Sequence, residues 1–206
     1  GTPQQPYQSV GRALANIGPG GTVWLQPGIY PWANEINRNG TSQLDMKTLR
    51  VPAGARLRAI TAGTVQLNFG VVALGSVIVS DVHFTLLADD VTEMQPSIVS
   101  IGASGELQLR KVTFGRVLNL QASAGGNITF DAQGDADHEW FTAEFQGAFG
   151  RVDVGHTRVL GGRMTLTRIP DGNNALSRRW GTYGGVGRLG FEGLVMELPE
   201  VPAGIS

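Results

Sequence analysis

The stretch Val77–Phe84, VIVSDVHF, has a counterpart thirty residues further along the chain, Leu107–Phe114, LQLRKVTF. Apolar residues occupy the first, third, sixth and eighth positions of both copies. One continuous strand alternates with a period of two, so the step from the third position to the sixth breaks the alternation. Each copy therefore predicts a strand, a corner and a second strand, with the apolar sides of both strands facing one interior.

Similar short segments follow one another along most of the chain. Of its 206 residues 41% are hydrophobic, 30 are glycine and only 16% are charged, which indicates one all-β domain with many turns and a sizeable core. Regular repeats of this length are typical of stacked architectures, and a β-sandwich is the alternative. Further strand candidates, bounded by turn-forming residues, are TVWLQ (22–26), VQLNF (65–69), IVSIG (98–102), NITF (127–130) and RMTLTRI (163–169).

A helix is predicted near the start, over Ser9–Ile17. Val10, Ala13, Leu14 and Ile17 follow the spacing of one helical face. Ser9 is a candidate N-cap, and Gly18 and Pro19 end the pattern.

Several classes of function are disfavoured by composition. The net charge of −1 lacks the basic excess of a nucleic-acid binder, and the chain has no cysteine for a disulfide or thiolate site. No apolar run reaches the roughly 18 residues of a membrane span. No second histidine stands at zinc-ligand spacing, and GTYGGVGRLG (181–190) lacks the ending of a phosphate loop. We therefore predict no nucleic acid, no membrane span and no zinc site.

The charges are unevenly distributed. Residues 117–150 contain five acidic and no basic residues, whereas 151–190 contain seven arginines and two aspartates. Two interpretations stay open. Opposite charges on neighbouring coils pair at the surface, or an acidic groove lies beside a basic rim.

The first 32 residues carry a recognisable set of motifs. In order these are Pro6-Tyr7, Ala13-Leu14, Pro19-Gly20, Val23–Leu25 and Pro27-Gly28-Ile29-Tyr30. The set resembles the first coil of right-handed parallel β-helix proteins of the pectin-lyase-like group, which includes phage tailspikes and polysaccharide-active enzymes. The resemblance implies an all-β, right-handed parallel β-helix of six or seven coils over residues 1–206. Its N-terminal cap, residues 1–20, would contain the short helix that plugs the open end.

The resemblance also implies a function. We expect a structural and recognition module of a phage particle or extracellular surface that contacts surface polysaccharide, a homo-oligomer and, by analogy with spikes, a trimer. The glycine-rich segment 170–206 is a candidate extended or interface segment. Two alternatives stay open: a polysaccharide lyase or glycoside hydrolase, and a virion or surface assembly protein with no sugar ligand.

The family's catalytic sets are incomplete. Polygalacturonase-like members carry Asn-Thr-Asp, Asp-Asp, Gly-His and Arg-Ile-Lys on successive coils. This chain has Asp89-Asp90, Gly155-His156 and Arg168-Ile169 in that order, but it has no Asn-Thr-Asp upstream and Pro170 replaces the lysine.

One acidic stretch is a candidate for catalysis or metal binding. In DAQGDADHEW (131–140), Asp135, Asp137 and Glu139 are the candidate catalytic carboxylates, because a glycosidase needs two such groups roughly 5 to 9.5 Å apart. The oxygens of Asp131–Glu139 are also a candidate Ca²⁺ loop. The alternative is a solvated acidic turn.

Carbohydrate binding is predicted for Trp140 with Asp137 and His138, because an aromatic face covers sugar C–H groups while carboxylates accept hydroxyl protons. The alternative places Trp140 and Phe141 in the core with only one of them exposed. For the remaining aromatic residues the predictions are that Trp24 is core, that Trp32 and Trp180 are exposed or at a contact, and that His83 faces outward.

Overall fold

The computed structural model describes residues 1–2, 4–36, 48–86, 97–101, 105–116, 119–123, 126–142, 156–165, 188–193 and 195–197. This part of the chain is almost entirely β-structure in parallel sheets, so the predicted all-β class is confirmed. The elements are α1 (Val10–Leu14), β1 (Thr22–Leu25), β2 (Gly28–Tyr30), α2 (Ala33–Ile36), β3 (Thr48–Pro52), β4 (Arg56–Ala59), β5 (Val65–Leu67), β6 (Gly70–Leu74), β7 (Val77–Ser80), β8 (His83–Leu86), β9 (Ser97–Ile101), β10 (Glu106–Arg110), β11 (Thr113–Arg116), β12 (Asn119–Ser123), β13 (Asn127–Asp131), β14 (His156–Leu160), β15 (Arg163–Thr165), β16 (Arg188–Glu192) and β17 (Val195–Glu197).

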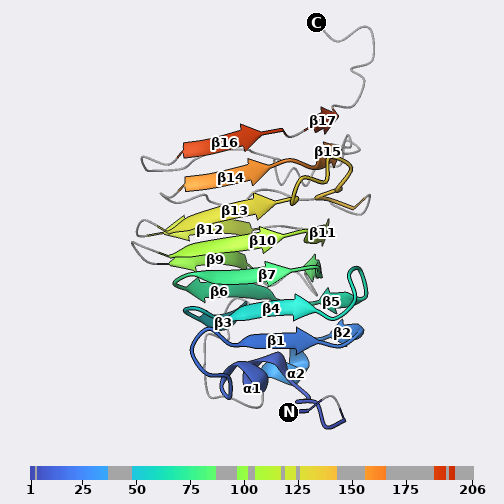
Figure 1. Ribbon diagram of the computed structural model, residues 1–206, viewed down its shortest axis with the longest axis vertical. Coiled ribbons are helices and arrows are strands. Elements are labelled where there is room, and N and C mark those ends of the chain that lie inside the picture. Colours follow the sequence, from blue (N-terminus) through green and yellow to red (C-terminus); the bar gives the residue numbers. More distant parts are fainter. Residues whose placement is uncertain are drawn as a thin grey trace, which may run out of the picture.

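The strands are shared among four sheets, and each named strand pair is parallel (Figure 1). The largest sheet has seven strands in the order β1-β4-β7-β10-β13-β14-β16. Two four-stranded sheets have the orders β2-β5-β8-β11 and β3-β6-β9-β12, and β15 pairs with β17. From β1 to β10, each strand therefore pairs with the strand three places further along the chain. We call one pass through the sheets a tier; the tiers are β1–β3, β4–β6, β7–β9, β10–β12, β13, β14–β15 and β16–β17.

The repeat found in the sequence is the step from one tier to the next. Leu107 lies beside Val77, and Phe114 lies beside Phe84. All eight apolar positions of the two copies are at most 2% exposed, as the strand, corner and strand pattern predicts. Between the two arms, Asp81 and Lys111 have positive φ values of 62° and 47°. This left-handed residue turns the corner, so the apolar side chains of both arms face inward.

Aromatic rings connect the tiers within the core. The rings of Phe84 and Phe114 are stacked, and Phe114 also packs against Phe130 and Phe141. Phe130 meets Trp140 edge to face. Aromatic pairs of this kind stabilise a core by about 0.5–1.5 kcal/mol beyond the burial of their area. The interior is therefore built from side chains that contact the tier above and below.

Helix α1 is shorter than predicted, Val10–Leu14 in place of Ser9–Ile17. Ser9 is its N-cap as expected, because its side chain accepts a hydrogen bond from the Arg12 amide. At the other end the Asn16 side chain donates to the Arg12 carbonyl at 2.7 Å, and this competes with continuation of the helix. Val10, Ala13 and Leu14 are buried, so the predicted apolar face is confirmed.

A second partner of α1 comes from outside the helix. The buried carboxylate of Glu35, in α2, accepts hydrogen bonds from the amides of Val10 and Gly11 at 2.9 and 2.8 Å. These amides belong to the first turn, where no intrahelical acceptor exists and a negative charge is favoured by the helix dipole. The sequence pattern around Ser9 did not indicate this contact.

Part of the C-terminal segment 170–206 continues the stack. β16 pairs with β14, and β17 pairs with β15. The rest of this segment, including Trp180, lies outside the described residues. Within the part of the chain that is described, no helix is long and apolar enough to cross a bilayer.

Candidate functional site

Several of the paired polar side chains in the described part of the chain lie on the outward side of the seven-stranded sheet. We call this side the outer face. Alternation along β4 buries Leu57 and Ala59 and turns Arg56 and Arg58 outward. Because the strands are in parallel register, outward residues of successive tiers stand in rows. One row runs Trp24, Arg58, Ser80, Arg110, Asp131, Leu160 and Glu192.

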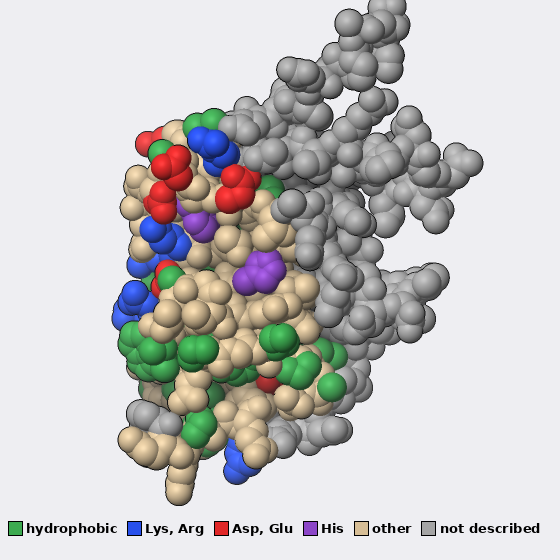
Figure 2. All heavy atoms as spheres, turned by 90° about the vertical axis from the view of Figure 1, so that its right-hand side faces the viewer, with side chains coloured by type: hydrophobic (Ala, Val, Ile, Leu, Met, Phe, Trp, Pro, Cys, Tyr) green, Lys and Arg blue, Asp and Glu red, His purple; other side chains and the backbone are tan. Residues whose placement is uncertain are grey.

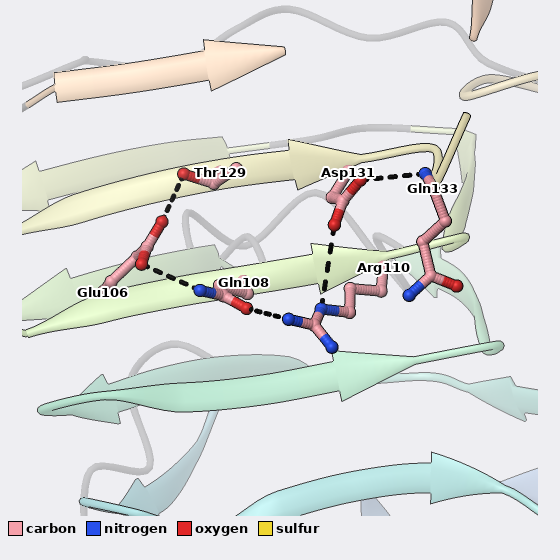
Figure 3. A network of polar contacts seen from close by, with 6 residues as sticks. All are labelled: Glu106, Gln108, Arg110, Thr129, Asp131 and Gln133. Atoms are coloured by element: carbon pink, nitrogen blue, oxygen red, sulfur yellow. Dashed lines mark hydrogen bonds and ion pairs between the residues drawn. The ribbon is translucent and has the colours of Figure 1, made fainter. Parts of the chain in front are cut away.

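The middle of the outer face is a hydrogen-bonded network across β10 and β13 (Figure 3). Glu106 accepts hydrogen bonds from Thr129 at 2.6 Å and from Gln108 at 2.8 Å. Gln108 in turn accepts one from Arg110 at 2.6 Å. Arg110 forms an ion pair with Asp131, with 3.8 Å between Nε and Oδ2. The network holds two carboxylates and one guanidinium in fixed positions on a half-exposed surface.

The N-terminal part of the same face holds an exposed aromatic residue and an arginine. Trp24 is 56% exposed, and the guanidinium of Arg58 lies over its ring, 5.6 Å from the centroid. Asp81 of the next tier holds Arg58 at 3.2 Å. An indole face with a guanidinium beside it is a planar surface that offers both apolar contact and hydrogen-bond donors. At the other end of the face, Arg158 pairs with Glu192 at 3.4 Å.

The prediction that Trp24 is a core residue is wrong. Its neighbours Val23 and Leu25 are 6% and 2% exposed, and strict alternation in β1 then turns Trp24 to the outside. Trp32, predicted to be exposed or at a contact, is instead partly buried and packs against the core, with its ring 6.0 Å from that of Phe69.

Among the predicted catalytic carboxylates, Asp135 lies in the turn after β13. Its carboxylate binds the ammonium group of Lys111 at 2.9 Å and also accepts a hydrogen bond from the Asp137 amide. The hydrogen bond from Lys111 holds the pKa of Asp135 below its ordinary value. A glycosidase acid needs the opposite shift, because it must keep its proton near neutral pH. Asp135 therefore does not fit the role of the general acid.

Asp137 and Glu139 also connect the turn to the next tier. The carboxylate of Asp137 lies 3.6 Å from the guanidinium of Arg163, and Glu139 forms a backbone bridge with the same residue. Asp137 and Arg163 belong to the acidic and basic segments of the sequence, so this contact favours the interpretation in which those charges pair between neighbouring coils.

His138 is a half-buried residue with an internal partner. Its Nε2 lies 2.8 Å from the carbonyl oxygen of Val112, which can only accept, so Nε2 carries the proton. Its ring packs edge to face on Trp140, with 4.5 Å between centroids. Burial lowers the pKa of His138, although the bond to Val112 and the carboxylate of Asp135 oppose this shift. These contacts give His138 a role in joining the turn to the core.

The prediction that Trp140 binds a sugar through its ring face is corrected. Trp140 is 0% exposed, and its indole N–H donates to the Gly161 carbonyl at 2.9 Å. Phe141 is also buried, so neither member of the pair is exposed. The space around the indole is filled, because a Cβ atom at Gly162 would collide with it. Of the three predicted carbohydrate-binding residues, only Asp137 is well exposed.

The acidic turn does not gather its carboxylates around one point. Asp131 accepts a hydrogen bond from the Gln133 amide and pairs with Arg110, while Asp135 and Asp137 pair with other cations. In the described ranges no group of three or more histidine, aspartate or glutamate side chains is arranged to hold a metal ion. Calcium binding by Asp131–Glu139 stays a prediction.

Three further predictions concern other residues. His83 faces out of the core as expected, is partly exposed, and its Nδ1 lies 2.7 Å from the Thr113 hydroxyl of the next tier. Asp89-Asp90, Gly155 and Arg168–Pro170 lie outside the described residues, and of His156 only the backbone is described.

Charged and hydrophobic surface side chains occupy different parts of the stack. On the side shown in Figure 2, charged side chains gather toward the upper tiers, and hydrophobic side chains form a band over the tiers near the N-terminus. Among the described residues, the exposed large hydrophobic side chains of the cap and the first two tiers are Tyr7, Trp24, Ile29, Ile60 and Leu74. Trp24, Arg58 and Glu106 are not among the predicted site residues, although the alternation in their strands indicates that all three face outward.

Comparison with known proteins gives no relative for this chain: no family model, no curated protein and no solved structure matches it.

Proposed function

We propose that the chain is a right-handed parallel β-helix that serves as a structural and recognition module of a phage particle or extracellular surface, and that it binds surface polysaccharide on its outer face. Two features support the β-helix. In the first four tiers each strand pairs with the strand three places along the chain, and the corners between strands keep apolar residues inside. Stacking tiers in this way buries a continuous core that no single tier could form. Homo-oligomerisation, as a trimer, belongs to the same proposal by analogy with spikes.

The observation that carries the binding proposal is the arrangement of Trp24 and Arg58 next to the Glu106–Asp131 network. Together they give one sheet face an exposed aromatic ring, guanidinium donors and carboxylate acceptors. Seven strands at about 4.8 Å spacing make the face about 29 Å long. A polysaccharide is a long chain of apolar C–H faces and hydroxyl groups, so it requires contacts repeated along such a length.

The carboxylates favour recognition over catalysis. Within the described chain, each of Asp131, Asp135 and Asp137 has a basic partner, and the pKa of Asp135 is lowered. The carboxylate of Asp135 therefore does not retain a proton for a leaving group. The same ion pairs connect neighbouring tiers, which supports the structural part of the proposal.

The test is binding of the purified chain to an array of bacterial capsular, O-antigen and plant polysaccharides, with an assay of reducing-end and unsaturated-uronate release. We expect binding without turnover, and a loss of about tenfold in affinity for both Trp24→Ala and Arg58→Ala. Leu74→Ala is the matched control, since Leu74 is 44% exposed but lies on β6 in another sheet.

Two other outcomes would each support an alternative function in place of the proposed one. Turnover that disappears in Asp137→Ala or Glu139→Ala would establish the lyase or hydrolase alternative. A silent array together with a stable homo-oligomer in light scattering would establish an assembly protein without a sugar ligand.

A further inference from the structure

A groove lies at the N-terminal end of the stack, away from the polar network of the outer face. Its cavity volume is about 510 Å³, within the range of small-molecule and peptide sites. One wall is the chain before α1, including Pro6 and Tyr7, and a second wall is α1 itself, including Val10 and Ala13. The third wall is the whole of β1 and β2 with the corner between them.

The third wall is an open sheet edge. β1 ends the seven-stranded sheet, and β2 ends a four-stranded sheet at the same end of the molecule (Figure 1). In a parallel sheet the backbone groups of alternate residues point to opposite neighbours. The amides of Arg56 and Ile60 bond to the carbonyls of Gly21 and Leu25, so these residues of the β1 segment face β4. The N–H and C=O groups of Thr22 and Trp24 consequently point away from β4, on the side that lines the groove.

The same reasoning applies to β2. The Gly28 amide bonds to the Thr64 carbonyl, and the Tyr30 carbonyl accepts from the Asn68 amide. Gly28 and Tyr30 therefore face the second tier, and the backbone of Ile29 points to the open side. Thr22 and Trp24 thus present backbone donors and acceptors along the edge of β1, and Ile29 does so at the edge of β2 in the adjoining sheet. Unpaired edge groups of this kind are a template for another strand.

The side chains around this edge are uncharged, and the large exposed ones among them are apolar or aromatic. Ile29 is 65% exposed, Trp24 56%, Ile60 55% and Tyr7 37%, and all four line the groove. No residue that lines it has a charged side chain, although the neighbouring outer face is rich in arginine and carboxylate. A contiguous exposed apolar surface with this composition is typical of a binding site.

We propose that this groove binds an extended, uncharged polypeptide segment, which adds a strand to the open edge of β1 and lies against the side chain of Ile29. The occupant is a polypeptide because its backbone groups repeat at the same interval as those of Thr22 and Trp24, two residues apart on β1. Its alternate side chains are apolar, since Ile29, Ile60 and Tyr7 offer no charged partner. β1 is four residues long and spans about 13 Å, so a segment of four to six residues matches its length.

The test uses the whole chain and a defined probe, the acetylated and amidated hexapeptide TVQLNF, which is the sequence of residues 64–69. It is uncharged and alternates apolar residues. Hydrogen exchange and fluorescence titration measure its binding, and we expect protection of the amides of Thr22 and Trp24. Ile29→Lys should weaken binding by at least about tenfold, whereas Leu74→Lys, at an exposed apolar site on β6, should leave it unchanged.

Two backbone-methylated probes separate strand pairing from simple apolar contact. One carries N-methyl groups on its first, third and fifth residues, and the other on the second, fourth and sixth. Edge pairing uses only alternate amides, so one probe should bind roughly 10- to 100-fold more weakly than the other, the equivalent of two hydrogen bonds. Equal binding of both methylated probes would overturn the proposal.

Two further results would also overturn it. One is no binding of the unmodified peptide at up to about 1 mM. The other is binding of maltohexaose or cellohexaose that Ile29→Lys abolishes, which would make the groove a neutral sugar site. The polysaccharide proposal is tested separately by Arg58→Ala, because Arg58 does not line the groove.

Discussion

The rings of Phe84 and Phe114 stack with their centroids 5.4 Å apart and only 11° between their planes. The two residues are thirty positions apart in sequence and are direct register partners in β8 and β11. Neither is exposed to solvent. Their contact shows how one repeat of the sequence becomes one step of the structure.

Phe114 should be among the most sensitive core positions, because its ring also packs against Phe130 and Phe141. Phe114→Ala leaves a cavity between three tiers, and we expect a loss of about 3–5 kcal/mol in the free energy of unfolding. Ile60→Ala, at a residue that is 55% exposed, should change it by no more than about 0.5 kcal/mol. Urea denaturation followed by circular dichroism measures both, and equal losses would contradict this view of the core.

Substitutions at Gln133, in the turn after β13, test whether its left-handed backbone conformation lowers the free energy of unfolding. Gln133 is exposed and has a φ of 54°. Glycine adopts this conformation without steric cost, so Gln133→Gly should stabilise by up to about 1 kcal/mol, while the β-branched Gln133→Val should destabilise by about 1–2 kcal/mol. The neighbouring Ala136 is also exposed but has no positive φ. Ala136→Gly should therefore lower the melting temperature, and a rise there would refute the explanation.

Glu35 should stabilise α1 from outside the helix. Glu35→Ala removes the acceptor of the Val10 and Gly11 amides at a buried position, and we expect a loss of about 1–3 kcal/mol. Glu35→Gln keeps one side-chain oxygen and should lose less. Asn34→Ala, at the exposed residue beside it, is the control. Thermal melts measure the loss, and slowed hydrogen exchange at Val10 and Gly11 in the Ala variant would argue against the contact.

His138 predicts a pH dependence of stability. Burial lowers its pKa in the folded state, so below the ordinary value of about 6.5 the unfolded chain binds more protons than the folded one. The contribution of neutral His138 is fully present above that value, and it is lost as pH falls through the lowered folded pKa. The melting temperature should therefore fall between about pH 7 and pH 5. His138→Gln keeps a donor for the Val112 carbonyl and cannot titrate, so its profile should be flatter. Parallel profiles would exclude His138 as the source.

Local pattern predicted much of the strand structure. The alternating residues of β7 and β10, with the shift in parity at Asp81 and Lys111, predict both arms of the repeat and its buried residues. The alternation in β1 also indicates that Trp24 faces outward, because its neighbours Val23 and Leu25 face inward. The prediction that Trp24 is a core residue rests on its hydrophobicity, whereas its position in the strand decides that it faces outward.

The candidate site was harder to predict, because it depends on which tiers lie together. Trp140 and Phe141 are consecutive and both buried, which no alternating strand allows. Their burial depends on contacts with Phe130, Phe114 and the Gly161 carbonyl, which come from other tiers. No pattern within residues 131–140 indicates those neighbours.

The amino-acid sequence alone indicated several of the strands, the corner between the two arms of the repeat, the first helix and the apolar side of the repeated strands. These properties depend on the order of neighbouring residues, through side-chain alternation and backbone preference. Tertiary structure alone decided that Glu35 caps α1, that Lys111 neutralises Asp135, and that an open edge remains beside β1 and β2. Such contacts join residues about 20 or more positions apart, so they exist only once the register between tiers is set.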